Sequence, residues 1–149
     1  MRIIGIDPGQ SGGIACLCEA CTWAEPMPTA GKEVDAAALA ALVEGADVCW
    51  IEKVHSMPRQ GVATTFKFGM NYGTVLGVCG ALHVPVQLVT PQKWKAAVLA
   101  DTLKDKAAAI AYCRRRWPDL DLRENERCRV AHDGKADALC IAAYGGMQR

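Results

Sequence analysis

Hydrophobic residues form three short, strand-like runs at the start of the chain. Residues 2–7 alternate toward a β-strand that ends at Pro8 and Gly9, which interrupt regular structure. Residues 12–17 and 21–25 are two further apolar runs, each separated from the one before it by a short polar turn. Strands joined by such short turns pair side by side, so the pattern predicts an antiparallel meander.

Helical and strand-like patterns alternate along the rest of the chain. The predicted helices are residues 33–44, 62–81, 93–99, 102–117 and 132–144. The two predicted strands are residues 47–52 and 85–89. Helices between strands permit parallel pairing, so the order predicts an α/β fold: a mixed five-stranded sheet with helices on both faces.

Composition indicates an ordinary folded domain. The chain has 149 residues, which suits one domain spanning 1–149, and 51% hydrophobic with 22% charged residues argues against disorder. No apolar run is long enough to span a bilayer. Asp7 interrupts the first apolar run, whereas a signal peptide has a longer one. We therefore expect a cytoplasmic protein without a membrane partner.

The eight cysteines do not demand a disulfide scaffold, because a chain with a core of its own and no export signal does not need one. Most lie in apolar segments, which predicts buried free thiols. Those in strands and helices are Cys49, Cys79, Cys113 and Cys140. The alternative is a structural zinc site, in which Cys18 and Cys21 have ligand spacing and Cys128 and His132 supply the other two ligands.

Three carboxylates stand in segments that are otherwise apolar. Asp7 and Glu52 end two predicted strands, and Asp137 lies inside a helix of alanine, leucine and isoleucine. A charge in such a setting is costly unless it is paired or bound to a metal ion. Three convergent acids predict a site for Mg²⁺, and two such ions about 3.5–4 Å apart can drive phosphoryl transfer.

Basic residues are clustered although the net charge is only +1. They include Lys93, Lys95, Lys104, Lys106 and the run 114–116. These residues form either a solvated helix face or a surface that contacts nucleic acid, and charge alone does not decide between the two.

Several motifs together resemble the RuvC family of Holliday-junction resolvases. Residues 4–9 (IGIDPG) are similar to the family's opening motif, and Glu52 stands where its second acid ends a strand. Residues 137–142 resemble the helix that carries its last acid. Lys106 fits its lysine, and residues 69–73 are similar to its G-x-x-x-G helix. The likeness runs in order over nearly the whole chain.

This resemblance implies a ribonuclease-H-like fold and a homodimer that nicks opposing strands of a four-way DNA junction. It also implies two Mg²⁺ ions, with Mn²⁺ as a substitute, and catalysis at Asp7, Glu52 and Asp137. The expected function is therefore that of a crossover junction endodeoxyribonuclease in DNA recombination and repair, as in the phage-type members of the family.

The fourth metal ligand departs from the family pattern. The family places an acid three residues before the last one, where this chain has Gly134. Asp133 is the nearest carboxylate and can share a helix face with Asp137, so we expect it to be the fourth catalytic ligand. His132 is the competing candidate. A third interpretation gives Asp133 only a capping role at the helix start.

The expected DNA-contacting residues are His55, Lys67, Lys93, Lys104 and Lys106. His55, with Met57 nearby, occupies the place of the aromatic wedge of the family. Lysines are expected to contact phosphates, which fixes position rather than base sequence.

Gly69, Gly73 and Gly77 recur every four residues and therefore share one helix face. Glycine inside a helix costs about 0.5–1 kcal/mol relative to alanine, which close packing would offset. The packing partner is either the sheet or the same helix of a second subunit.

Three other functions are compatible with parts of the sequence. A sugar-kinase-like or actin-like ATPase has a phosphate turn like residues 7–13, but it needs a second half that this chain is too short to hold. A nuclease acting on structured RNA shares the opening motif. A non-catalytic junction-binding protein is the third, and retention of the three acids argues against it.

Overall fold

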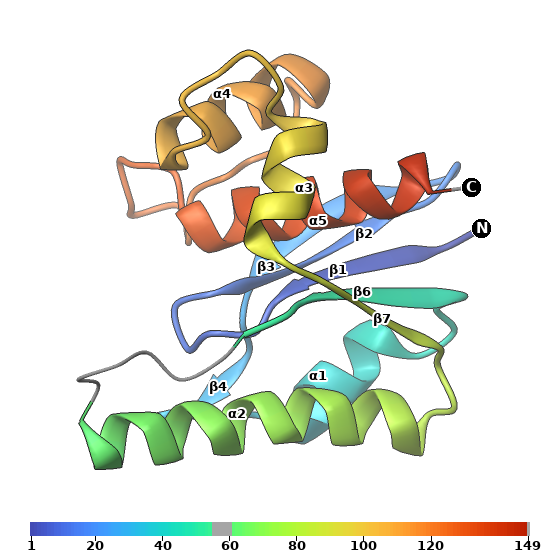
Figure 1. Ribbon diagram of the computed structural model, residues 1–149, viewed down its shortest axis with the longest axis vertical. Helices are drawn as coiled ribbons and strands as arrows, with labels where there is room; N and C mark the ends of the chain where they lie inside the picture. The colour runs from blue at the N-terminus through green and yellow to red at the C-terminus, as the bar shows by residue number, and fades with distance from the viewer. Residues whose placement is uncertain (55–60, 149) are drawn as a thin grey trace.

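The computed structural model describes residues 1–54 and 61–148 (Figure 1). At its centre is a five-stranded sheet in the order β3-β2-β1-β6-β7. The strands are β1 (Ile3–Asp7), β2 (Gly13–Leu17), β3 (Thr22–Pro26), β6 (Val48–Glu52) and β7 (Val86–Val89). The first three pair antiparallel, and β6 is parallel to both β1 and β7. The mixed sheet predicted from the sequence is confirmed.

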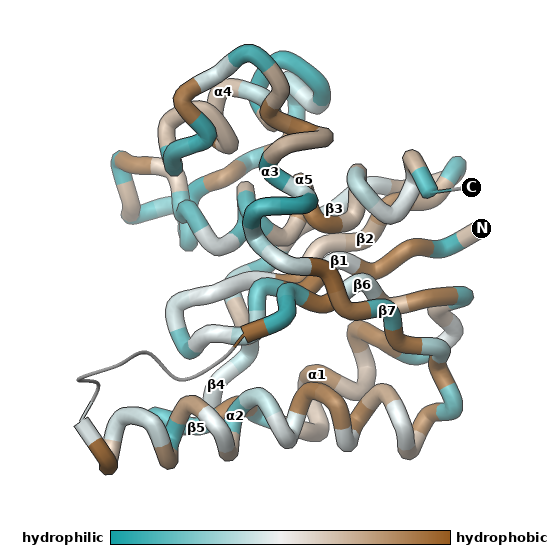
Figure 2. The backbone as a smooth tube through the Cα atoms, in the orientation of Figure 1, coloured by the Kyte–Doolittle hydropathy of each residue, from teal (hydrophilic) through white to brown (hydrophobic). Residues whose placement is uncertain are grey.

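Helices cover both faces of this sheet (Figure 1). One face carries α1 (Ala36–Val43) and α2 (Val62–Ala81). The other carries α3 (Pro91–Val98), α4 (Lys106–Arg116) and α5 (Asp133–Met147). Figure 2 shows that hydrophobic residues are frequent along the strands of the sheet, which lies between the two helical layers. No helix in the described part of the chain is long and apolar enough to cross a membrane.

Side-chain alternation along β1 divides the core into two parts. Ile4 and Ile6 are fully buried on the side of α1 and α2. Gly5 points to the opposite side, where a Cβ would overlap the backbone of Ala138 in α5. The glycine therefore lets α5 lie directly on the strand that ends in Asp7.

The helix predicted from residue 33 begins later, at Ala36. Residues 29–30 and 33–34 instead form a small hairpin of β4 (Thr29–Ala30) and β5 (Glu33–Val34). Asp35 then caps α1, because its carboxylate accepts hydrogen bonds from the backbone N–H groups of Ala37 and Ala38. Apolar composition alone predicts one longer helix, because it does not register the aspartate cap.

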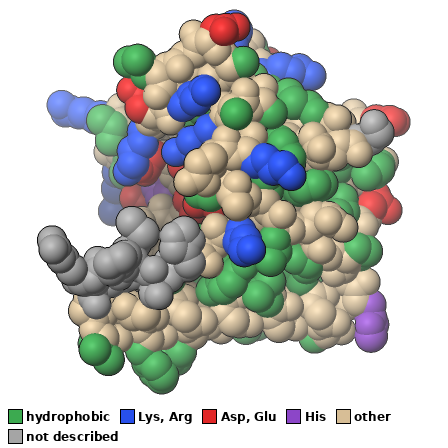
Figure 3. Space-filling model, viewed as in Figure 1, with side chains coloured by type: hydrophobic (Ala, Val, Ile, Leu, Met, Phe, Trp, Pro, Cys, Tyr) green, Lys and Arg blue, Asp and Glu red, His purple; other side chains and the backbone are tan. Residues whose placement is uncertain are grey.

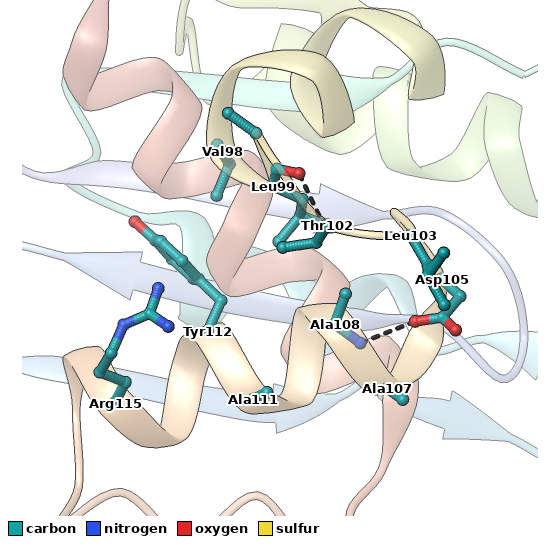
Figure 4. A pocket seen from close by; sticks show the side chains of 11 residues that line it. Val98, Leu99, Thr102, Leu103, Asp105, Ala107, Ala108, Ala111, Tyr112 and Arg115 are labelled. Carbon is teal, nitrogen blue, oxygen red and sulfur yellow. Dashed lines mark hydrogen bonds between the residues drawn. The ribbon is translucent and has the colours of Figure 1, made fainter.

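The helix predicted from residue 102 also begins later, at Lys106. Lys104 has a left-handed backbone (φ 57°), which interrupts a helix, and Asp105 accepts the backbone N–H of Ala108 at 2.8 Å as the N-cap. Figure 4 shows this cap beside a cavity of about 360 Å³ between α3 and α4, with Tyr112 and Leu99 in its lining.

Candidate active site

Two parallel strands bring the first two acids to one edge of the sheet. Ile6 of β1 pairs with Ile51 of β6, so Asp7 and Glu52 follow at the same strand ends. Asp137 lies next to Ala138, the residue of α5 that rests on Gly5 of β1. The fold therefore brings the three predicted acids together from three separate elements.

Burial and mutual repulsion raise the pKa values of these acids. The pKa of Asp7 rises to about 7, first through burial and then through the negative charges of Glu52 and Asp137. The pKa of Asp137 rises to about 6, again mainly through burial, although Lys95 opposes the rise. Burial also raises the pKa of Glu52. Such a cluster favours protons or cations between its members.

The acidic cluster is open rather than a tight cage. No three acidic side chains in the described part of the chain have ligand oxygens that all lie within 4.8 Å of one another. This spacing suits hydrated hard cations, because Mg²⁺ keeps several of its waters and uses few protein carboxylates.

Asp133 pairs with Lys106 at the edge of this cluster. The carboxylate of Asp133 forms a salt bridge with the Lys106 ammonium, which holds the pKa of Asp133 below its usual value. The charge of Asp133 still raises the pKa values of Asp7 and Asp137. Asp133 is thus within electrostatic range of Asp7 and Asp137.

The interpretation of Asp133 as a helix cap is wrong, because His132 is the N-cap of α5. The Nδ1 atom of His132 accepts the backbone N–H of Lys135 at 3.2 Å. Asp133 is already the first residue of the helix. Its carboxylate forms the salt bridge with Lys106.

Close packing of backbones explains why position 134 carries no acid. A Cβ on Gly134 would lie 2.5 Å from the carbonyl oxygen of Gly12 and 2.6 Å from that of Ser11. A Cβ on Gly13 would lie 2.5 Å from the carbonyl oxygen of Gly134. The first turn of α5 therefore lies directly on the β1–β2 turn, which leaves no space for a side chain.

Two residues that the sequence analysis did not assign to the site contact it from α3. Trp94 is fully buried, and its indole Nε1 donates a hydrogen bond to Oε2 of Glu52 at 2.7 Å. The Lys95 ammonium lies 5.2 Å from the Trp94 ring centroid and lowers the pKa values of Glu52 and Asp137. No sequence signal pointed to either residue, because their place follows from the pairing of Glu52 with Val89, just before α3.

The lysines expected to contact DNA are exposed on several elements. Lys67 lies on α2 beside a cavity of about 350 Å³ that Gln10 also lines. Lys93 lies on α3, and Lys104 on the turn before α4. The predicted wedge at His55 and Met57 lies outside the described residues.

Figure 3 shows how charged side chains are distributed on one face of the molecule. Lys and Arg side chains gather on the part that carries α3 and α4, and acidic side chains lie in a recess beside them. A positive surface around an acidic recess suits a polyanion that approaches bound cations.

Comparison with known proteins places the fold. The sequence matches no family model, and no curated protein matches it. The fold is similar to the Thermus thermophilus RuvC structure, with TM-score 0.64 and 22% sequence identity. The match covers 99% of this chain and 96% of the RuvC chain. RuvC of T. thermophilus in complex with a Holliday junction substrate matches with the same coverage and identity and TM-score 0.65.

A yeast mitochondrial Holliday junction resolvase also matches, with TM-score 0.54 and 14% identity over 96% of this chain and 76% of that one. These likenesses confirm the expected ribonuclease-H-like α/β fold.

Proposed function

We propose that this chain is a metal-dependent, structure-selective DNA endonuclease that resolves four-way or other branched junctions. The observation that carries the proposal is the cluster of Asp7, Glu52 and Asp137, three partly buried acids that share one edge of the sheet. The fold match includes a RuvC structure with a Holliday junction substrate, which favours branched DNA as the substrate.

Asp7, Glu52 and Asp137 would hold Mg²⁺, or Mn²⁺ in its place, with Asp133 as a further ligand. The donor set fits, because carboxylate oxygens are the ligands that these hard cations prefer and a cation would relieve the repulsion among the acids. Two bound ions would stabilise the attacking and leaving oxygens during hydrolysis of a phosphodiester.

The other residues would position these ligands and the DNA. Trp94 orients Glu52 through its hydrogen bond, and the charge of Lys95 keeps Glu52 and Asp137 closer to the ionised form that binds cations. Lys67, Lys93 and Lys104 would bind phosphates on either side of the cleaved bond. Lys106, which is exposed, would exchange its contact with Asp133 for a DNA phosphate.

Incubation with a synthetic four-way DNA junction tests the proposal. We expect paired nicks near the branch point with Mg²⁺ or Mn²⁺ and none with EDTA or with Ca²⁺ alone. Linear duplex DNA of the same sequence serves as the matched control and should stay intact. Preferred cleavage of structured RNA would instead support the RNA nuclease, and tight junction binding without cleavage would support the non-catalytic alternative.

We also propose that the chain acts as a homodimer and that α2 supplies its contact surface. The free face of α2 contains exposed Val62, Phe66 and Met70 near its start. Gly69, Gly73 and Gly77 continue this face, and a Cβ on any of the three would meet no atom within 4 Å. A second copy, which would place two equivalent sites on a two-fold junction, fits this face.

The idea that the glycines pack on the sheet is wrong. The buried residues of α2 are Asn71, Val75 and Cys79, which lie on its opposite side. Asn71, for example, accepts the backbone N–H of Val34 at 3.0 Å through its side chain.

Gly73→Leu is expected to weaken the dimer at least about tenfold, because a bulky side chain would separate two helices that approach through glycine. The fold itself should be unaffected or stabilised, since position 73 is open and leucine favours helix. Sedimentation equilibrium and thermal melting separate the two effects. Ala41→Leu, at an exposed position on α1, is the control. An unchanged dimer in the Gly73 variant would contradict this surface.

A further inference from the structure

Three free cysteines converge at the turn between β2 and β3. Cys16 and Cys18 are two residues apart along an extended segment, so their side chains point to the same face. Cys16 pairs with Trp23 across the hairpin, and the register places Cys18 opposite Cys21, whose carbonyl accepts the Cys18 backbone N–H at 3.0 Å. The three sulfur atoms lie within 4.8 Å of one another.

This cluster is separate from the acidic site. β2 runs antiparallel to β1, with Gly13 opposite Asp7 and Leu17 opposite Ile3. The turn after Leu17 therefore lies at the end of the sheet opposite to the acids.

The four-ligand zinc site suggested by the sequence is corrected by this arrangement. His132 caps α5 beside the acidic site, and the sulfur of Cys128 faces the carboxylate of Glu124. Neither residue belongs to the group around Cys18 and Cys21. Cys16, which lies within β2, is the third sulfur that the tertiary structure adds.

We propose that Cys16, Cys18 and Cys21 bind one Zn²⁺ ion as thiolates, with the fourth position open to water. Zinc prefers thiolate sulfur and tetrahedral geometry, in which Zn–S bonds of about 2.3 Å place two sulfurs about 3.8 Å apart. Cys18 and Cys21 have their sulfur atoms 2.7 Å apart, so metal binding needs only a small separation of the pair. Exposure of Cys21 leaves a route for the ion and for water.

Neighbouring groups provide the electrostatics that such a site needs. The Cys18 sulfur accepts the backbone N–H of Cys21 at 2.9 Å, a bond that strengthens when the acceptor is a thiolate. The Arg2 guanidinium donates hydrogen bonds to the carbonyl oxygens of Leu42 and Glu44. Burial raises the pKa of the Cys16 thiol, and the positive charge of Arg2 opposes this rise. Three thiolates and one Zn²⁺ carry a net charge of −1, which the fixed positive charge of Arg2 balances.

The consequence of this site is structural. β3 forms one edge of the five-stranded sheet, and an edge strand is held by one neighbour only. A metal ion that links β2 to the turn leading into β3 would fasten this edge. The inference does not depend on nuclease activity.

Zinc titration of the reduced full chain tests the proposal. Excess Mg²⁺ is present to occupy carboxylates, and binding is measured by calorimetry and, with Cd²⁺, by the ultraviolet thiolate-to-metal absorption. We expect one ion per chain. Cys18→Ser and Cys21→Ser should each weaken binding at least about 100-fold. Cys128→Ser, which changes a thiol outside the cluster, should bind like the wild type.

Thiol protection gives a second readout that does not depend on variants. Bound zinc should protect Cys18 and Cys21 from alkylation and leave Cys128 reactive, as read by mass spectrometry. Cys16→Ala should also weaken binding, with circular dichroism as the check that this buried variant folds. Zinc affinity that is unchanged in the Cys18 and Cys21 variants would overturn the site. So would a chain that binds no zinc and forms a Cys18–Cys21 disulfide instead.

Discussion

Asp7→Asn is expected to lower metal-dependent cleavage by about 10³-fold or more and to raise the melting temperature above pH 7. Loss of a metal ligand removes several kcal/mol of transition-state stabilisation, and each 1.36 kcal/mol is a factor of ten in rate. Asparagine has nearly the same shape but no charge. It therefore removes the ligand charge together with the repulsion that Asp7 shares with Glu52 and Asp137.

The stability effect has a defined pH window. The pKa of Asp7 is about 7 in the folded protein, compared with 3.8 for the unperturbed group, so the folded state binds the extra proton between these values. Stability therefore falls as pH rises from about 4 to 7, and the full cost is present above 7. A pKa difference of about three corresponds to at most roughly 4 kcal/mol of folding stability. The wild type loses this stability above pH 7, and the Asn variant does not.

Thermal melting of both proteins at pH 5 and pH 8, without and with Mg²⁺, checks this prediction. The variant should have the higher melting temperature at pH 8 without metal. Mg²⁺ should reduce this difference in melting temperature by stabilising the wild type. Asp133→Asn is the comparison, because Asp133 is only partly buried and already paired with Lys106. It should lower cleavage without a gain in stability. Near-normal turnover of Asp7→Asn would refute the assignment of the site.

Gly134→Ala is expected to destabilise the fold by about 1–3 kcal/mol and to lower cleavage as well. Its Cβ would lie 2.5–2.6 Å from the carbonyl oxygens of Gly12 and Ser11, and backbone atoms cannot move aside as a flexible side chain can. Relief of the overlap would displace the first turn of α5, which carries Asp133 and leads to Asp137. The effect should therefore appear in both denaturant unfolding and junction cleavage.

Gly146→Ala provides the matched control on the same helix. A Cβ there would meet only the Ile3 side chain, at 4.0 Å, which is ordinary van der Waals contact. Alanine favours helix over glycine by about 1 kcal/mol, so this variant should be as stable as the wild type or slightly more stable. Equal stability of the two variants would contradict the close backbone contact at Gly134.

Local patterns in the sequence determined most of the elements and the three acids in apolar segments. Alternation in β1 predicted a strand because Ile4 and Ile6 must share one face, and this face is buried. An acid at the end of an apolar strand or inside an apolar helix has few structural explanations, so Asp7, Glu52 and Asp137 could be selected without coordinates. The errors at residues 33–35 and 102–105 arose because an aspartate cap, and not apolar composition, sets where a helix begins.

The contacts around these acids were decided only by the tertiary structure. Trp94 and Glu52 are 42 positions apart, and Lys106 and Asp133 are the first residues of two different helices, α4 and α5. No periodicity in the chain encodes either pair, because hydrophobic periodicity reports which face is buried and not which distant residue lies against it. The register of the β2–β3 hairpin brings Cys16 to Cys18 and Cys21. The backbone of α5 can lie on the β1–β2 turn because Gly13 and Gly134 have no side chains at the contact. Such proximity arises when whole elements pack, which one sequence read locally does not specify.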